Sequence, residues 1–171
     1  ERAGAVEVFR VGEQVHHPRH GVGATGPRQQ AVGRAGDRIG LVGRNGAGKT
    51  TTLRMIATLL KPTSGCITVN GSDVVRDPMK VRTSIGFLTG STRLYERLTP
   101  EELVQYYADL HGMEKTRFVQ RRNELFDLLG IREFARRPIG KLSTGMRQKV
   151  SIARTIIHDP AVVVFDEPTV G

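Results

Sequence analysis

Residues 43–50 combine glycines, a lysine and a threonine at the spacing of a phosphate-binding loop. They read Gly-Arg-Asn-Gly-Ala-Gly-Lys-Thr and satisfy the pattern G-x-x-x-x-G-K-[ST]. The glycines let backbone N–H groups turn inward around phosphate oxygens at a helix N-terminus. Lys49 can reach the β- and γ-phosphates of a nucleotide, and the Thr50 hydroxyl can ligate Mg²⁺. The residues predicted to bind phosphate are Gly43, Arg44, Asn45, Gly46, Ala47, Gly48, Lys49, Thr50 and Thr51.

The elements on either side of this loop support a phosphate site over a plain strand-to-helix turn. The apolar residues 39–42 predict a buried strand before the loop. A helix is predicted after it, to about residue 60. The apolar face of that helix consists of Leu53, Ile56, Ala57 and Leu60, spaced i, i+3, i+4 and i+7. A strand, a glycine-rich turn and a helix in this order form the context that the motif requires.

An acidic pair follows a second apolar run. Asp166 and Glu167 come directly after residues 161–165. An aspartate at the end of a buried strand can hold Mg²⁺ or its water, and Glu167 can act as a general base if it reaches that water. Strand ends are often acidic, so the pair alone is a weak motif, but an upstream phosphate loop strengthens it. We therefore predict Thr50 and Asp166 as Mg²⁺ ligands and Glu167 as the catalytic residue.

A third segment, residues 142–148, reads Leu-Ser-Thr-Gly-Met-Arg-Gln. Its simplest interpretation is a helix start at which Ser143 caps the first turn. Alternatively, the Ser143 hydroxyl and the Gly145 N–H form a second phosphate-binding surface at the positive end of that helix. Such a surface is useful only if it faces a nucleotide. Within one chain it need not do so, whereas across a dimer it could face the partner's phosphates.

The remaining pattern indicates an α/β core with a helical lobe. Thr99 and Glu102 form a capping box with Pro100 at the first helical position. The tyrosine pair in the helix that follows could serve as a ligand platform, but its helical spacing favours core packing. The predicted buried stripe of that helix is Leu103, Tyr106, Tyr107 and Leu110. The other predicted elements are a strand and turn at 66–71, a strand at 84–88, helices at about 114–129 and from 143, and a strand at 161–165.

Composition narrows the possible functions. Cys66 is the only cysteine, which rules out an internal disulfide framework and a cysteine-based zinc site. No apolar run approaches the roughly 20 residues that span a bilayer. The net charge of +9 suggests an anionic partner, but the positive residues are scattered and no tryptophan is present, so nucleic acid is not the favoured partner. Residues 12–35 show no clear period and are interpreted as an atypical loop.

Together, these motifs resemble those of the ABC-type ATPases. Residues 43–51 are similar to the Walker A motif of that family, and residues 142–160 resemble its signature segment and the helix that follows. Residues 162–171 resemble the Walker B motif and the start of the loop after it. Residues 85–99 look like a bacterial export-type subgroup, which includes the ATP-binding subunits of sodium and drug efflux pumps.

The resemblance implies a P-loop NTPase core, with a mostly parallel sheet, into which a helical subdomain is inserted. Residues 1–171 would form a single partial ABC ATPase domain that stops before the final core strands. Residues 1–88 and 161–171 would belong to the core, and residues 89–160 to the helical subdomain that carries the signature. The sequence also departs from the family pattern. Gly90 falls where a glutamine is usual, and the signature reads LSTGM instead of LSGGQ but keeps Ser143 and Gly145. Phe9, the only aromatic residue before Walker A, is at a longer spacing than the aromatic residue that stacks on adenine in the family.

The resemblance also implies a function. The protein would bind MgATP, hydrolyse it and so power a membrane exporter, lying at the cytoplasmic face of the membrane through a transmembrane permease subunit. Two ATP-binding subunits, as a homodimer or heterodimer, would pack head to tail, so that Ser143 and Gly145 contact the γ-phosphate held by the partner. The alternatives are a non-transport ABC ATPase acting on ribosomes or DNA, and an inactive fragment that only binds nucleotide.

Overall fold

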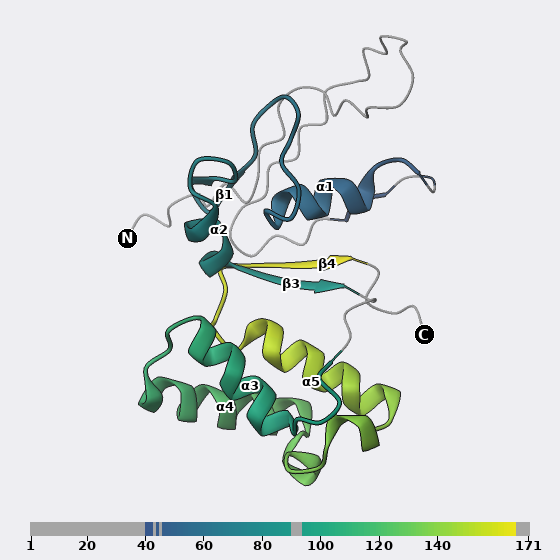
Figure 1. Ribbon diagram of the computed structural model, residues 1–171, viewed down its shortest axis with the longest axis vertical. Helices are drawn as coiled ribbons and strands as arrows, with labels where there is room; N and C mark the ends of the chain where they lie inside the picture. The colour runs from purple at the N-terminus through teal and green to yellow at the C-terminus, as the bar shows by residue number, and fades with distance from the viewer. Residues whose placement is uncertain (1–39, 43, 45, 90–93, 167–171) are drawn as a thin grey trace. The chain divides into compact units, whose positions relative to one another are not determined.

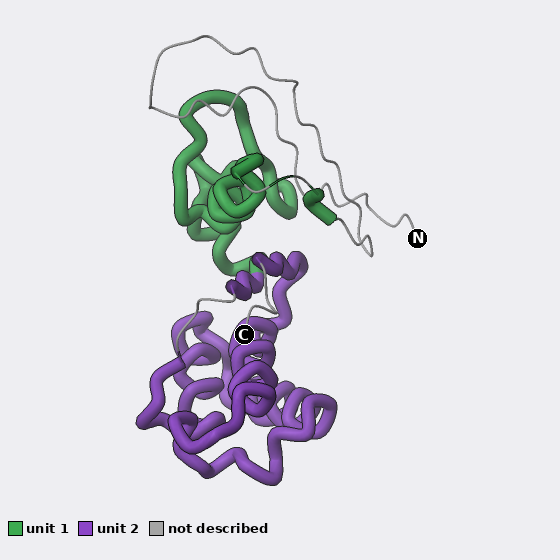
Figure 2. Tube along the Cα trace, turned by 90° about the vertical axis from the view of Figure 1, so that its right-hand side faces the viewer, with its two compact units in different colours: residues 1–85 green, residues 86–171 purple. Residues whose placement is uncertain are grey.

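The structure is a computed structural model that describes residues 40–42, 44, 46–89 and 94–166 of the 171-residue chain. The chain divides into two compact units, residues 1–85 and residues 86–171, shown in Figure 2. Each unit is described by itself. The predicted division into a core and a helical subdomain, with boundaries at 88/89 and 160/161, stays a prediction.

The described part of the first unit, residues 40–42, 44 and 46–85, contains two short helices and a hairpin. Its elements are α1 (Lys49–Ile56), β1 (Thr68–Val69), β2 (Ser72–Asp73) and α2 (Pro78–Ser84). Strands β1 and β2 pair antiparallel, with Thr68 opposite Asp73 and Val69 opposite Ser72. Asn70 and Gly71 connect them at φ 48° and 76°, the two successive positive angles of a two-residue hairpin turn. The strand and turn predicted at residues 66–71 are thus confirmed.

Helix α1 is shorter than the sequence predicted. It ends at Ile56, and Thr58 takes a left-handed backbone with φ 61°. Arg82 of α2 holds that conformation, because its Nε donates to Thr58 Oγ1 at 2.7 Å and its Nη2 to the Thr58 carbonyl oxygen at 3.4 Å. Ile56 and Ala57 are buried as predicted, but Leu60 is exposed. The contact from α2 therefore ends helix α1 before the apolar spacing of its sequence ends.

The strand predicted at residues 39–42 is not formed by the described part of that segment. Residues 40–42 have no regular structure, and the Val42 side chain is 98% exposed. A strand requires a hydrogen-bonded neighbour, and among the described strands β1 pairs with β2 and β3 with β4. An apolar run without such a neighbour stays irregular.

In the second unit, the helices lie between two strands in chain order, and these two strands pair with each other. Its order is β3 (Ile85–Thr89), α3 (Pro100–Leu110), α4 (Lys115–Leu129), the short 3₁₀ helices η1 (Arg132–Phe134) and η2 (Ile139–Lys141), α5 (Thr144–Ile156) and β4 (Val162–Asp166). Strands β3 and β4 are neighbours in one sheet, and Figure 1 shows their arrows running in the same direction. The strands are therefore parallel, and parallel strands need a long crossover such as the one these helices supply.

Helices α3, α4 and α5 pack against one another around an apolar core. The apolar face of α5 carries Met146, Val150, Ala153 and Ile157, of which the last three are fully buried and Met146 is partly buried. Gly130 ends α4 with a left-handed φ of 62°, as its type suggested. The core also includes Leu103, Val104, Ala108, Phe118, Leu125, Phe126, Ile131, Phe134, Ile139 and Leu142.

The start of α3 is as predicted, but its buried stripe is not. Thr99 Oγ1 accepts from the Glu102 N–H, and Glu102 Oε2 accepts from the Thr99 N–H at 2.8 Å, which completes the capping box. In contrast, Tyr106 is 45% and Leu110 63% exposed. The prediction was wrong for these two side chains because the helix turns Leu103, Val104 and Ala108 toward the core and leaves Tyr106 and Leu110 at its edge.

Gly86 allows β3 to pass close to the end of α5. A Cβ atom at this position would lie 2.6 Å from the carbonyl oxygen of Thr155 and 3.1 Å from Cγ of Pro160. Neither of these groups is the mobile tip of a flexible side chain. A glycine is therefore required here by the close approach of strand and helix.

Candidate functional site

The phosphate loop has the backbone that its glycines predicted. Gly43 and Asn45 lie outside the described residues. Gly46 and Gly48 have left-handed φ angles of 84° and 85°, and a Cβ atom at either position would meet nothing within 4 Å. Glycine is thus required by backbone conformation and not by crowding. The Ala47 N–H donates to the Arg44 carbonyl at 3.1 Å and closes a turn before the helix.

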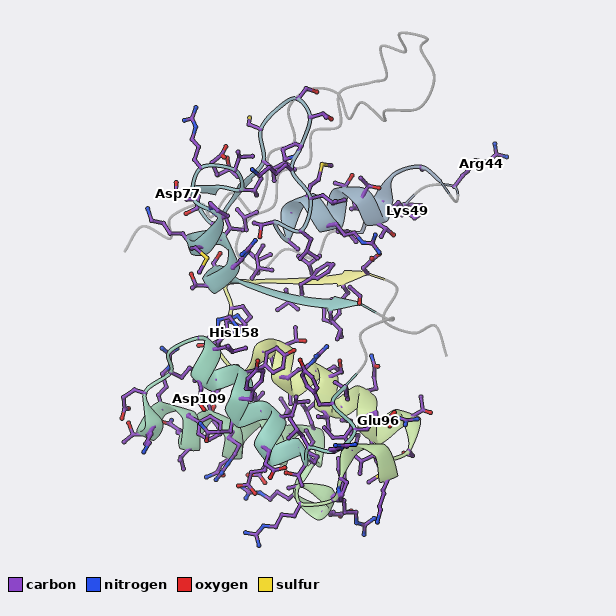
Figure 3. The ribbon with its side chains drawn as sticks, viewed as in Figure 1. Arg44, Lys49, Asp77, Glu96, Asp109 and His158 are labelled. Atoms are coloured by element: carbon purple, nitrogen blue, oxygen red, sulfur yellow. The ribbon has the colours of Figure 1, made fainter. Side chains whose placement is uncertain are left out.

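Helix α1 presents its N-terminus directly after this turn. Gly48 is its N-cap and offers no side-chain acceptor, and the first turn holds no acidic residue. The first N–H groups of a helix have no partner within the helix, so this end carries partial positive charge and suits an anion. Lys49 adds a full charge, because its Nζ donates to the Arg44 carbonyl oxygen at 3.0 Å and so lies over the loop. Figure 3 shows Lys49 at the start of α1 and Arg44 on the segment before it.

Asp166 ends strand β4 and is 8% exposed. Glu167 lies outside the described residues. The strand buries Val162 and Val164 but exposes Val163 and Phe165, so it buries one face and not the two faces expected of a central parallel strand. The Asp166 carboxylate thus stands at the carboxyl end of a parallel strand, where ligands bind in open α/β sheets.

The segment around Ser143 has the geometry of a capped helix start. Ser143 is the N-cap of α5, and its Oγ accepts from the Met146 N–H at 3.3 Å. Its carbonyl oxygen accepts from the Arg147 N–H at 2.9 Å. Gly145 lies in the first turn, and a Cβ atom there would meet nothing within 4 Å. Ser143 and Gly145 are both exposed, so this end of α5 is open to an anion from outside the chain.

The predicted site residues are distributed over both units. The loop residues and Thr51 belong to the first unit, whereas Ser143, Gly145 and Asp166 belong to the second. Within the second unit, the signature residues stand on α5 and Asp166 on β4. That these groups meet around one nucleotide remains a prediction.

Sequence reasoning missed one buried charge on the signature helix. Arg154 is only 5% exposed, and its Nη1 donates to the Tyr107 hydroxyl at 3.0 Å. The signal was present in the sequence, since Arg154 follows Val150 by four residues and precedes Ile157 by three, which puts it on the apolar face of α5.

His158 has a packing role. Its ring stacks on that of His111, with centroids 3.7 Å apart and planes 3° from parallel. Burial lowers the pKa of His111, because desolvation disfavours the charged imidazolium. This stack joins the loop after α3 to the residues after α5.

Solved structures place this arrangement in the fold of ABC ATPase domains, which is a P-loop NTPase fold. The protein cbiO1 from Clostridium perfringens, described as part of the ABC transporter complex cbiONQ, aligns with a TM-score of 0.81 at 25% identity. The alignment covers 96% of this chain and 67% of that one. The fold class predicted from the sequence is therefore confirmed.

The chain belongs to the ABC transporter family, because residues 33–170 match the family model with that description. It is 49% identical over 137 residues to the ABC transporter ATP-binding protein NatA of Bacillus subtilis. It is 37% identical over 136 residues to the bacitracin transport ATP-binding protein BcrA of Bacillus licheniformis. Each match covers 80% of this chain, but only 56% of NatA and 44% of BcrA. The chain thus spans about half the length of these relatives.

The cap at Ser143 can be tested without nucleotide. We expect Ser143→Ala to lower the free energy of unfolding by about 1 kcal/mol, because the Met146 N–H loses its acceptor, and Ser143→Gly to lower it by only a few tenths. Urea denaturation of the purified chain measures both changes. Thr144→Ala, one residue further on, is the matched control. A Ser143→Ala variant as stable as the wild type would contradict the capping role.

Proposed function

We propose that this chain is the ATP-binding part of an ABC-type exporter and that the full-length protein hydrolyses ATP. The observation that carries the proposal is the loop before α1, where two left-handed glycines, a helix N-terminus and the Lys49 ammonium converge. Family membership, and relatives whose names state ATP binding and transport, support it. The export-type pattern at residues 85–99 favours outward transport.

In this proposal the loop grips the triphosphate. Backbone N–H groups between Gly46 and Thr51 donate to phosphate oxygens, and Lys49 moves from the Arg44 carbonyl to the β- and γ-phosphates. The Thr50 hydroxyl and the Asp166 carboxylate supply oxygen ligands, which are the donors that Mg²⁺ prefers. When bound, Mg²⁺ would neutralise charge on the phosphates.

Hydrolysis then depends on the second unit. Glu167 accepts a proton from the attacking water, which it can do only within hydrogen-bond reach of that water. Ser143 and Gly145, at the open start of α5, donate to the γ-phosphate held by a second subunit in a head-to-tail dimer. The site is thus completed only when two subunits close, which makes hydrolysis depend on their association.

A transmembrane permease is the proposed partner. Among the described residues, none of the helices has the length and hydropathy to cross a bilayer. We propose that the protein acts at the cytoplasmic face of the membrane by binding this permease, to which closure of the ATP-binding dimer transmits movement. The relative cbiO1 is itself described as part of a transporter complex.

Removal of the loop cation tests nucleotide binding. We expect Lys49→Ala to raise the dissociation constant for MgATP by about tenfold or more, because a charge-assisted contact to phosphate contributes roughly 1.5–3 kcal/mol. Equilibrium binding of MgATP to the chain measures the change. Lys61→Ala, which removes an exposed lysine outside the loop, should leave affinity unchanged. Equal MgATP affinities of the wild type and Lys49→Ala would contradict the proposal that this loop binds the nucleotide.

The role of Glu167 requires the full-length protein. We expect Glu167→Gln to keep MgATP affinity and to lower steady-state hydrolysis by about a hundredfold or more, because the amide cannot take the proton of the attacking water. Glu133→Gln, an isosteric change outside the site, serves as the control. Undiminished turnover of Glu167→Gln would remove this residue from the role of base.

A further inference from the structure

The residues just before the signature are hydrogen-bonded to one short segment of the chain. We use the term signature turn for residues 142–147, and clamp segment for residues 95–98. The Ile139 N–H donates to the Leu98 carbonyl at 2.8 Å, and the Gly140 N–H donates to the Glu96 carbonyl at 2.9 Å. Both donors lie in η2, which leads directly into Ser143. Figure 3 shows Glu96 near the N-terminal end of α5.

Gly140 is in close contact with this segment. A Cβ atom at Gly140 would lie 3.2 Å from Cβ of Glu96 and 3.3 Å from its carbonyl oxygen, the same oxygen that accepts the Gly140 hydrogen bond. Gly140 is not among the residues with positive φ, so its backbone conformation is open to any residue. The lack of a side chain therefore serves one purpose, which is to let η2 approach Glu96.

A second set of contacts connects the middle of α5 to the clamp segment. Arg154 lies over the Tyr107 ring, with its guanidinium carbon 5.2 Å from the centroid, in addition to its hydrogen bond to the hydroxyl. Tyr107 meets Tyr106 edge to face at 5.6 Å, and Tyr106 meets Tyr95 edge to face at 6.3 Å. Tyr95 is the first residue of the clamp segment. The contacts therefore form a closed ring that contains the signature turn.

We propose that the clamp segment positions the signature turn for ATP turnover, with Gly140 and Arg154 as positioning residues. The inference rests on the proposed function, in which Ser143 and Gly145 face a γ-phosphate. The phosphate loop belongs to the other unit of the chain, so displacement of the signature turn affects turnover without affecting the grip on ATP. A misplacement of about 1 Å can cost on the order of a hundredfold in rate. A Cβ atom at Gly140 requires a shift of only a few tenths of an ångström between η2 and Glu96, so a smaller loss of rate is expected.

A purely structural role for Gly140 predicts a different result. Gly140 is exposed, and an added methyl group there fills no cavity and breaks no core contact. Replacing a glycine with alanine where the backbone allows it tends to stabilise a protein, because the unfolded chain loses freedom. If the close approach to Glu96 served stability alone, Gly140→Ala would shift the urea midpoint, and kcat would change only as far as stability does.

The test compares Gly140→Ala and Gly140→Val with the wild type in the full-length protein. We expect kcat to fall by about threefold for alanine and about tenfold for valine, while KM for ATP stays within about twofold. The urea midpoint should stay close to that of the wild type. Amide hydrogen exchange at Met146 and Arg147, in the first turn of α5, should become faster in Gly140→Val.

A second variant tests the other side of the ring. Tyr107→Phe removes the hydroxyl that accepts from Arg154 and keeps the aromatic contacts. It should lower kcat by about threefold with KM unchanged. Gly130→Asn is the matched control, because Gly130 has a left-handed φ that asparagine tolerates and its nearest neighbour is the flexible Lys149 Nζ at 3.5 Å. This control should leave kcat unchanged.

The outcomes separate the two proposals. If the wild type turns over MgATP and kcat is unchanged in Gly140→Val and Tyr107→Phe, the positioning role of the clamp segment is wrong. The proposed function then stands. A fall in kcat that only follows a fall in stability, and that the core variant Phe134→Leu reproduces, also overturns it. A wild type without MgATP-dependent turnover contradicts the proposed function, and the clamp with it.

Discussion

The left-handed backbone at Gly46 and Gly48 is the constraint on which the candidate site depends. For an L-residue with a side chain, this conformation costs roughly 1–2 kcal/mol at each position. It reverses the chain ahead of α1, so that the N-terminus of the helix and the Lys49 ammonium point to the same place. The space around both glycines is open, so conformation alone explains the choice of residue.

The helical lobe also holds an exposed helix N-terminus in a fixed position, but through side-chain packing and not through left-handed glycines. The N-terminus of α5 is exposed and capped by Ser143, but the body of the helix is fixed by a buried apolar stripe and by Arg154. An open helix end on a rigid, well-packed helix can present fixed N–H groups to an anion. The residues before the helix are also anchored, because η2 is hydrogen-bonded to the carbonyl groups of residues 96 and 98.

The sequence was informative where local chemistry determines structure. The phosphate loop, the Thr99 capping box and the Asn70–Gly71 turn were predicted because each depends on a few neighbouring residues. Errors arose where distant residues decide. The end of α1 depends on Arg82, which is 24 residues from Thr58. The buried face of α3 depends on how it packs against α4 and α5, so a plausible stripe placed Tyr106 in the core when it lies at the edge.

The same distinction applies to the site. The sequence identified Ser143 as a cap and Asp166 as a strand end, but periodicity alone did not find the Arg154–Tyr107 contact or the close approach of Gly140 to Glu96. Both arise from packing between segments more than 40 residues apart in the chain. Family membership supports the function, whereas the ring of contacts around the signature turn is visible only in three dimensions.

A crystal structure of the protein with Mg²⁺ and a nonhydrolysable ATP analogue would test the central claim most directly. We expect backbone N–H groups between Gly46 and Thr51 to surround the triphosphate, and Lys49 Nζ to leave the Arg44 carbonyl and contact phosphate oxygens. An analogue bound elsewhere, or a loop whose entrance is closed by its own backbone while Lys49 stays on Arg44, would contradict it.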